Sequence, residues 1–258
     1  MEQDFQFFEQ WVYKNLSIDL TAYKPTQLHR RIFTIMNRAG YTNLKEYSKA
    51  ISKDENLRIQ FLDYITINVT EFFRNKEIFL DLQEKIQIHL LNKFSPLKIW
   101  SAACSIGAEP YSLAIILDKV SKKNTHKILA TDIDNSILQR AKQGIYTLNE
   151  IKNLDLQDRL TYFDQREGKF SLKEDIKRKV TFKKHDLILD PYEKDFHLIV
   201  CRNVIIYFKN ETKDKIYQKF HESLVPGGLL FVGATETIFN YKQLGFEKVS
   251  TFLYQKKE

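Results

Sequence analysis

The spacing of hydrophobic and polar positions divides the chain into two parts with different periods. Over residues 1 to about 75 the apolar positions recur at helical spacing, as at Phe5 and Phe8, which predicts helix throughout this part. Thr42 is expected to cap one of these helices. From about residue 97 short apolar runs alternate with helical patterns, which is typical of a parallel sheet with helices on both faces.

The second part contains six predicted strands, and the last two are close enough in sequence for one of them to run antiparallel. The predicted strands cover residues 97–102, 126–132, 179–186, 196–203, 227–234 and 246–257. The interval 150–186 is longer than a simple crossover, and its short alternating pieces around Gly168 predict a small β insertion at about 160–184. We therefore expect a helical domain over residues 1–75 and an α/β domain over residues 76–258.

The stretch WSAACSIGAEPYSLAIIL, residues 100–117, changes period at a loop that contains Gly107. It predicts a strand, a tight loop and a helix that tolerates Pro110 in its first turn. The loop lacks the G-x-G-x-x-G spacing of dinucleotide sites, and Glu109 at the helix entrance would repel phosphates. The sequence therefore predicts a nucleoside-like ligand that carries positive charge.

Polar side chains stand at or just after the ends of the predicted parallel strands: Glu109, Asp132, Asp186, Arg202 and Asn203. These strand ends share one edge of a doubly wound sheet, so we expect the five side chains to converge on a single crevice. Asp132 is placed where a carboxylate accepts hydrogen bonds from both hydroxyls of a ribose.

Each of these residues also has a purely structural interpretation. Asp132 would instead cap the helix that contains NSILQRAKQGI, and Glu109 would only satisfy the dipole of its own helix. Arg202 and Asn203 would belong to a polar loop. The sequence leaves these alternatives open.

The overall composition adds information about partners and environment. The formal net charge of +7 favours an acidic partner, which leaves nucleic acid, an anionic membrane face and an acidic protein as alternatives. Both cysteines lie in apolar runs, the start MEQDFQFFEQ is not a signal peptide, and no apolar run approaches the roughly 20 residues of a membrane span. We expect a reduced, cytoplasmic protein without a metal site.

Five strings appear in an order and spacing that resemble a known family. They are NVTEFFR (68–74), CSIGAEPYSLA (104–114), ATDID (130–134) with GIY (144–146), CRNVIIYF (201–208) and LVPGGLLFVG (224–233). Together they resemble the chemotaxis receptor methyltransferases, the CheR family, which use S-adenosylmethionine to methylate glutamate side chains of chemoreceptors. The resemblance implies a small all-helical N-terminal domain, followed by a Rossmann-like methyltransferase domain with an inserted β subdomain.

The resemblance also implies a set of residues around S-adenosylmethionine: Asn68, Thr70, Arg74, Glu109, Asp132, Asp186, Leu187, Arg202 and Asn203. Arg74 would bind the carboxylate of the cofactor. Tyr207 resembles the active-site tyrosine of the family and would orient the glutamate, although a core aromatic is the alternative. The loop departs from many family members at Ala103, Ile106 and Ala108.

Docking of the receptor is implied for the basic N-terminal domain. Lys24, Arg30, Arg31 and Arg38 would face the acidic methylation helices of the receptor, and a solvated helix face is the alternative. Some family members capture a peptide at the receptor's C-terminus on an open edge of the insertion. Because lysines discourage edge pairing, we expect no such tether peptide here, with a solvated hairpin as the alternative.

Two other functions remain as alternatives at this stage. A nucleic-acid methyltransferase would agree with the basic charge, but the fourth strand ends in CRNV and not in an Asn/Asp-Pro-Pro-Tyr string. A non-catalytic module that retains the cofactor is the second alternative. We expect a monomeric protein-glutamate O-methyltransferase that does not bind nucleic acid.

Overall fold

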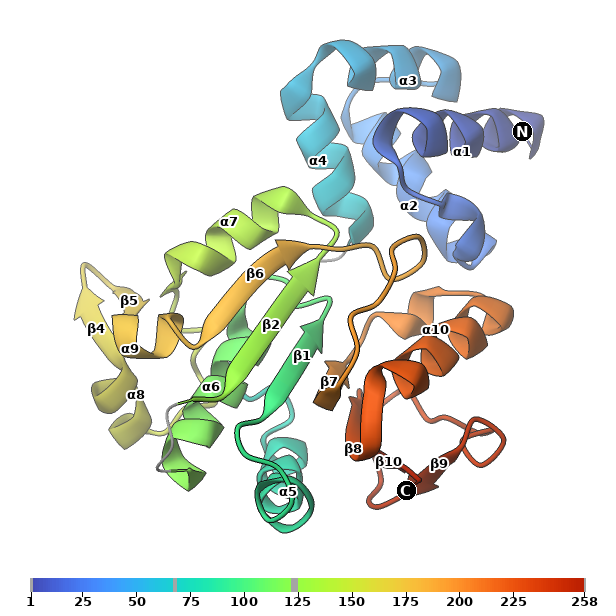
Figure 1. The fold of residues 1–258 in the computed structure, drawn as a ribbon. Helices are drawn as coiled ribbons and strands as arrows, with labels where there is room; N and C mark the ends of the chain where they lie inside the picture. The colour runs from blue at the N-terminus through green and yellow to red at the C-terminus, as the bar shows by residue number, and fades with distance from the viewer. Residues whose placement is uncertain (1, 67–68, 122–124, 258) are drawn as a thin grey trace.

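A computed structural model describes residues 2–66, 69–121 and 125–257, and it shows a cluster of helices above an α/β body (Figure 1). The helices and helical turns are α1 (Glu2–Leu16), η1 (Leu20–Ala22), α2 (Pro25–Arg38), α3 (Leu44–Lys53), α4 (Glu55–Thr66), α5 (Lys76–Lys85), η2 (Ile86–Leu91), α6 (Ala108–Val120), α7 (Asn135–Gln143), α8 (Leu156–Tyr162), α9 (Glu174–Lys177), η3 (Ile205–Tyr207) and α10 (Asn210–Ser223). The strands are β1 (Lys98–Ala102), β2 (Lys127–Asp132), β3 (Ile145–Tyr146), β4 (Phe163–Arg166), β5 (Lys169–Leu172), β6 (Val180–Lys184), β7 (Phe196–Cys201), β8 (Leu224–Val232), β9 (Phe246–Lys248) and β10 (Leu253–Lys256).

Helices α1 to α4 enclose a core of their own around Phe8, Tyr47 and Phe61, all fully buried. The expected cap at Thr42 is wrong, because the side chain of Asn43 caps α3 and accepts a hydrogen bond from the Glu46 amide at 2.8 Å.

The expectation of helix as far as residue 75 is also wrong for the segment that follows α4, where residues 69–75 form a loop with a turn at 72–73. Phe72 is fully buried in the core of the α/β body, against the rings of Tyr146 and Phe163. Its amide donates to the Glu150 carbonyl at 2.8 Å, so this segment is anchored to the α/β body instead of continuing a helix. The division of the chain into domains at residue 75 stays a prediction.

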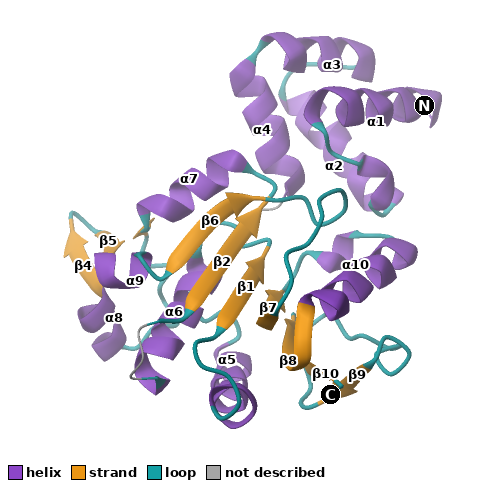
Figure 2. Ribbon diagram, viewed as in Figure 1, coloured by secondary structure: helices purple, strands orange, loops and turns teal. Residues whose placement is uncertain are grey.

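The main sheet has the order β6-β2-β1-β7-β8-β10-β9 and lies between helices on its two faces (Figure 2). Strands β6, β2, β1, β7 and β8 pair in parallel, and β10 pairs antiparallel with β8, as the short connection near the C-terminus predicts. We expected a single strand over residues 246–257, and this expectation is wrong. The segment forms the two strands β9 and β10. The Val249 amide donates to the Leu253 carbonyl at 3.0 Å, which folds the segment back on itself.

The predicted β insertion exists, but it covers a different range. Its three strands have the order β3-β5-β4 and span residues 145–172 together with α8. The expected range of 160–184 therefore begins too late and ends too late, because β6 pairs with β2 in the main sheet. None of the described helices is long and apolar enough to cross a membrane.

The junction between β1 and α6 depends on Gly107, which has a φ of +84°. A Cβ at this position would lie 3.0 Å from Ala141 Cβ and 3.1 Å from Tyr111 Cε2. Gly40 has a similar φ of +81°, but a Cβ there would meet nothing within 4 Å. The two glycines thus share a left-handed backbone and differ in the space around them.

We expect Gly40→Ala to lower the free energy of unfolding by about 1–2 kcal/mol, the cost of a left-handed backbone for an L-residue. Gly107→Ala should cost about 1–3 kcal/mol more, because the added methyl group also overpacks the junction. Urea unfolding of the two variants measures both losses. Equal losses would mean that the junction relaxes around the methyl group.

Candidate functional site

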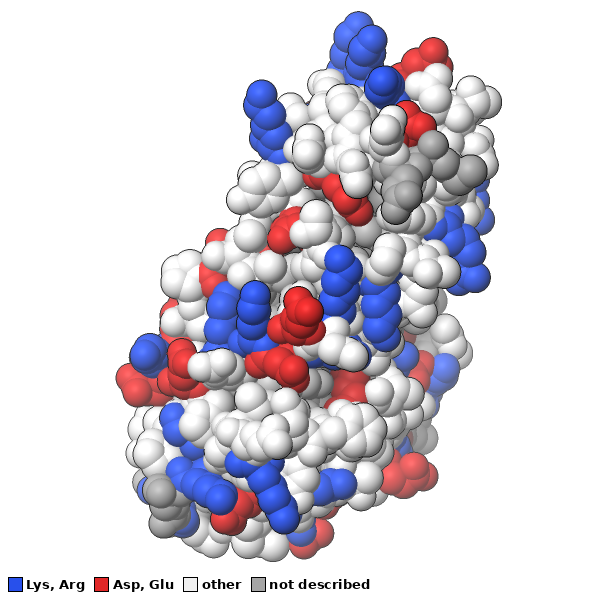
Figure 3. Space-filling model, turned by 90° about the vertical axis from the view of Figure 1, so that its right-hand side faces the viewer, with Lys and Arg blue, Asp and Glu red and all other residues white. Residues whose placement is uncertain are grey.

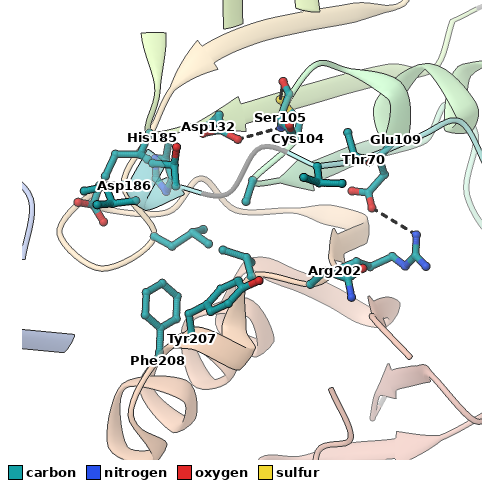
Figure 4. Close-up of a pocket in the computed structure, with 18 of the residues that line it drawn as sticks. Thr70, Cys104, Ser105, Glu109, Asp132, His185, Asp186, Arg202, Tyr207 and Phe208 are labelled. Carbon is teal, nitrogen blue, oxygen red and sulfur yellow. Dashed lines mark hydrogen bonds and ion pairs between the residues drawn. The ribbon is translucent and has the colours of Figure 1, made fainter. Parts of the chain in front are cut away.

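The C-terminal ends of four neighbouring strands, β6, β2, β1 and β7, meet at one pocket beneath the helical cluster (Figure 4). Asp132 ends β2, Asp186 follows β6, and Arg202 follows β7, while Glu109 lies in the first turn of α6 after β1. The space between atoms is about 960 Å³, including the open mouth. The convergence expected from the strand ends is therefore present.

The loop after β1 shapes the floor of this pocket. Ala103, Ser105 and Gly107 have positive φ angles of 64°, 50° and 84°, so the backbone turns sharply at every second residue. The loop is held against the end of β2, because the Cys104 amide donates to the Thr131 carbonyl at 2.8 Å. The Ser105 amide also donates to Asp132 Oδ2 at 2.8 Å, which fixes the orientation of that carboxylate.

Asp132 is not a helix cap. The cap of α7 is Asp134, whose Oδ1 accepts hydrogen bonds from the amides of Ser136 at 2.8 Å and Ile137 at 3.3 Å. Asp132 is buried and lines the pocket, and its burial raises the pKa of the carboxyl to about 6. The structural alternative for Asp132 is therefore wrong.

Glu109 and Arg202 form a buried pair at the other end of the pocket. Arg202 Nη1 lies 3.7 Å from Glu109 Oε2, and the Ser101 hydroxyl donates to Glu109 Oε1 at 2.8 Å. Burial raises the pKa of Glu109, and the positive charge of Arg202 opposes that rise. Because Glu109 binds these two partners, it does more than satisfy the dipole of α6.

Arg202 also ties the sheet to the segment that follows the helical cluster. Its Nη2 donates to the Arg74 carbonyl at 2.9 Å and to Asn75 Oδ1 at 3.1 Å. Its guanidinium lies over the rings of Phe79 and Phe231, 5.0 Å from each centroid. Arg202 is thus a buried connection between two parts of the molecule and not part of a solvated loop.

Asp186 has a vacant acceptor at the pocket. Its Oδ1 accepts hydrogen bonds from the amides of Ile188 at 2.7 Å and Leu189 at 3.3 Å. Its Oδ2 is buried and has no hydrogen-bond partner among the residues that the structure describes. The same holds for Ser105 Oγ and for Nε2 of His185. Since unpaired buried polar groups are costly, these atoms fit a ligand that supplies both donors and acceptors.

The charges that line the pocket match a cationic ligand. Among the described lining residues, the carboxylates of Glu109, Asp132 and Asp186 stand against the guanidinium groups of Arg74 and Arg202. Burial lowers the pKa of His185, which favours its neutral form. The pocket therefore has one formal negative charge in excess, which is compatible with the positively charged ligand that the sequence predicts.

The remaining expected site residues also line this pocket, with one exception. Thr70, Arg74, Leu187, Asn203 and Tyr207 belong to its wall. Tyr207 lies in η3 and is half-buried, with its ring beside Phe208 in Figure 4. Asn68 lies outside the described residues. The individual roles of these side chains stay predictions.

Glu236, which is not among the residues expected from the sequence, organises the backbone beside the pocket. Its Oε2 accepts hydrogen bonds from the amides of Asn203 at 2.6 Å and Gly233 at 2.8 Å, and its Oε1 from those of Val204 at 3.0 Å and Ile205 at 2.9 Å. This carboxylate holds Asn203 in its left-handed conformation, with a φ of 62°. The position of Glu236 just beyond β8 is the signal that the strand-end argument overlooked.

Tyr23 was missed for a different reason. It lines the same pocket from the helical cluster and makes an isolated bridge with Phe208. Nothing in the local sequence around Tyr23 indicates this contact.

Comparison with known proteins gives a consistent result over nearly the whole chain. Residues 3–66 match the family described as "CheR methyltransferase, all-alpha domain", and residues 68–253 match "CheR methyltransferase, SAM binding domain". A chemotaxis protein methyltransferase of Listeria innocua is 40% identical over 257 residues, which cover 99% of this chain and 98% of that protein. Those of Borreliella burgdorferi and Pseudomonas aeruginosa (methyltransferase 1) are each 36% identical, over 93% and 92% of this chain and 90% and 91% of theirs.

We expect Asp132→Ala to weaken binding of S-adenosylmethionine by about 1.5–3 kcal/mol, the usual value for hydrogen bonds to a charged group. Wild-type affinity should also fall as the pH drops below about 6, because the raised pKa leaves the Asp132 carboxyl protonated there. Calorimetry at several pH values measures both effects.

Asp134→Ala is the matched control for this prediction. It removes a neighbouring carboxylate that caps α7, so it should cost about 0.5–2 kcal/mol of stability and leave the affinity unchanged. Unchanged affinity in a folded Asp132→Ala variant would exclude Asp132 from the cofactor site.

Proposed function

Because the chain belongs to the CheR methyltransferase family and contains its S-adenosylmethionine-binding domain, we propose that it methylates glutamate side chains of chemotaxis receptors. The observation that carries this proposal is the buried row of carboxylates at neighbouring strand ends, with the open acceptor Asp186 Oδ2. A nucleoside with a positively charged substituent satisfies both the vacant acceptor and the excess negative charge. The products are a glutamate methyl ester and S-adenosylhomocysteine.

We assign the carboxylates to different parts of the cofactor. Asp186 accepts from the adenine amino group, and Asp132 accepts from the ribose hydroxyls. Glu109 lies near the sulfonium and ammonium groups of the cofactor, which are positively charged. Arg74 offers its guanidinium to the carboxylate of the cofactor. Thr70, Leu187, Arg202 and Asn203 complete the wall, and Asn68 is assigned to the same site from the family resemblance alone.

The protein contributes positioning more than acid or base catalysis. A glutamate carboxylate, with a pKa near 4.3, is already ionised at neutral pH, so no residue needs to remove a proton from it. When bound, S-adenosylmethionine supplies a methyl group on a positively charged sulfur. Tyr207 orients the glutamate through its hydroxyl, and the helical cluster above the pocket limits the access of water, which favours a transfer that neutralises two charges.

The receptor-facing surface is assigned to the helical cluster, and the structure distinguishes its basic residues. Arg30 and Arg38 are exposed, and Lys24 is half-buried at the start of α2. Arg31 is different, because it donates to the Tyr64 carbonyl and lies over the Tyr64 ring at 4.7 Å. Arg31 therefore also holds α2 against α4. The Arg38 guanidinium lies over the same ring, 5.3 Å from its centroid, so Arg30 is the better test of docking. We propose that the protein acts on these receptors as a cytoplasmic monomer that binds no nucleic acid.

We proposed from the lysines of the β insertion that this protein needs no receptor tether. The positions of these lysines give that proposal less support than the sequence did. Lys169 lies on β5, the central strand of the insertion, and Lys173 Nζ donates to the Thr161 carbonyl at 2.7 Å. Lys179 pairs with Asp118 at 2.5 Å. These lysines do not line an open edge. The proposal therefore rests on the hairpin of β4 and β5, which has Gly168 as its only glycine and looks shorter than in the family members that bind a tether peptide.

The decisive test of the function is transfer of labelled methyl groups to the cytoplasmic fragment of a chemoreceptor. We expect label in the receptor fragment that is released as methanol by mild base, because methyl esters are base-labile. Label that resists base, or that enters DNA or RNA offered in the same assay, would contradict glutamate methylation. Binding of S-adenosylmethionine without any transfer would identify a non-catalytic module.

The tether proposal is tested with two receptor fragments that differ only in their C-terminal tail. We expect the same methylation rate with and without the tail, because docking on the methylation helices is then sufficient. A third receptor fragment, which keeps the tail but has a shortened flexible linker before it, is the control for the change in fragment length. A rate that collapses only when the tail is removed would show that the receptor is tethered.

A further inference from the structure

Phe239 is a large apolar side chain that the protein presents to solvent on a fixed backbone. It is 91% exposed, the most of any large hydrophobic residue in the described part of the chain. Both of its neighbours are anchored: the Ile238 amide donates to the Tyr254 hydroxyl at 3.1 Å, and Asn240 Nδ2 donates to Asp214 Oδ1 at 3.1 Å. Ile238 is itself 1% exposed. Phe239 is therefore held outward by its surroundings.

A groove with about 1040 Å³ of space between atoms, including its open side, runs beside Phe239, between residues 235–240 and the start of α10. Ile205 and Ile206 of η3 form its apolar wall, and Lys213 of α10 lies on its rim. This groove is separate from the cofactor pocket, but the two share the short segment η3 that ends at Tyr207. A chain bound in the groove would lie next to the tyrosine that is assigned to the glutamate.

Two lysines from different parts of the sequence lie on backbone segments that are joined here: the Lys209 amide donates to the Ala22 carbonyl at 2.9 Å, and the Lys213 amide donates to the Lys209 carbonyl at 3.0 Å. Lys213 is the fourth residue of α10, and Lys24 is the N-cap residue of α2. Burial lowers the pKa of Lys213, and the positive charge of Lys24 lowers it further, against the opposing effects of Glu236 and Asp214. Neither lysine forms an ion pair with any residue described in the structure.

The carboxylates nearest to Lys213 are already bound by other groups. Asp214 accepts the hydrogen bond from Asn240, and Glu236 is buried among four backbone amides. The positive charge of the two lysines is therefore available to an external anion. Figure 3 shows the side of the molecule on which α2 and α10 lie, where lysine and arginine side chains stand across the middle with acidic side chains among them.

The backbone fixes these features relative to the active site. The Lys24 amide donates to the Tyr207 carbonyl at 2.9 Å, and the Lys209 amide donates to the Ala22 carbonyl at 2.9 Å. These two bonds flank the bridge between Tyr23 and Phe208. The lysine pair and Tyr207 are thus parts of one rigid junction between the helical cluster and the α/β body.

We propose that Phe239, its groove and Lys213, all in the α/β body, form a second docking surface for the acidic methylation helix of the receptor, which continues the receptor-facing surface of the helical cluster at Lys24. The inference rests on the proposed function and names the partner of the same site. A helix that is acidic on one side fits here, because its carboxylates meet the two lysines while an apolar side chain packs on Phe239. The receptor helix would then be held on both sides of Tyr207, by α2 and by α10.

The test compares Lys213→Glu and Phe239→Ser with Lys215→Glu in the full-length protein. Lys215 is exposed on the same helix two residues further, about 200° around the axis, so it gives the same charge change away from the groove. Each variant is assayed with labelled S-adenosylmethionine and the cytoplasmic fragment of a chemoreceptor. For Lys213→Glu and Phe239→Ser we expect KM for the receptor fragment to rise about tenfold with kcat unchanged, as for the minority of contact residues that contribute most to an interface.

Lys215→Glu should behave as wild type, and calorimetry should give the same affinity for S-adenosylmethionine in all three variants. The rise in KM for Lys213→Glu should also shrink with added salt, since screening removes the repulsion. Unchanged KM in both groove variants, or a loss confined to kcat, would overturn the second docking surface. If wild-type protein does not methylate the receptor fragment at all, the proposed function fails instead, and the two failures are distinguishable.

Discussion

Parallel pairing of β1 with β2 on one side and with β7 on the other is the constraint on which the rest of the site depends. In this register Ala102 is opposite both Thr131 and Cys201, so the three strands end level. The next residues along the chain, Asp132 and Arg202, therefore reach one edge together with the loop after β1. Residues that are far apart in sequence meet because hydrogen-bond register aligns the strands that carry them.

The polar groups at that edge are buried at a cost that the surrounding structure offsets only in part. Asp132 is compensated by the Ser105 and Asp134 amides, and Glu109 by Ser101 and Arg202. For Asp186, backbone amides donate to Oδ1, whereas Oδ2 receives no hydrogen bond from the described residues. A buried acceptor without a donor destabilises the protein alone and is relieved by a ligand that donates to it. A ligand that donates a hydrogen bond to Asp186 Oδ2 therefore gains affinity, because it removes this destabilisation.

The helical cluster takes part in the site through two connections to the α/β body. Arg202 binds the carbonyl of Arg74 and the side chain of Asn75, and the segment around Tyr23 pairs with the segment around Phe208. Both connections pass beside the pocket, and they place Tyr23 and Tyr207 in its wall. A change in how the two parts pack would therefore alter the pocket together with the surface that is proposed to face the receptor.

The sequence by itself determined the alternation of strands and helices, the parallel sheet and the strand-end positions of Glu109, Asp132, Asp186 and Arg202, because hydrophobic periodicity and turn residues act locally. It misplaced the cap of α3 by one residue and merged β9 with β10, since competing side chains and a turn without glycine leave little local signal. Only the tertiary structure decided that Asp134 caps α7 while Asp132 lines the pocket. Likewise, Glu236 supports the backbone beside the pocket, Tyr23 joins the pocket wall, and Arg31 packs on Tyr64. These contacts join residues distant in sequence, which no local pattern encodes.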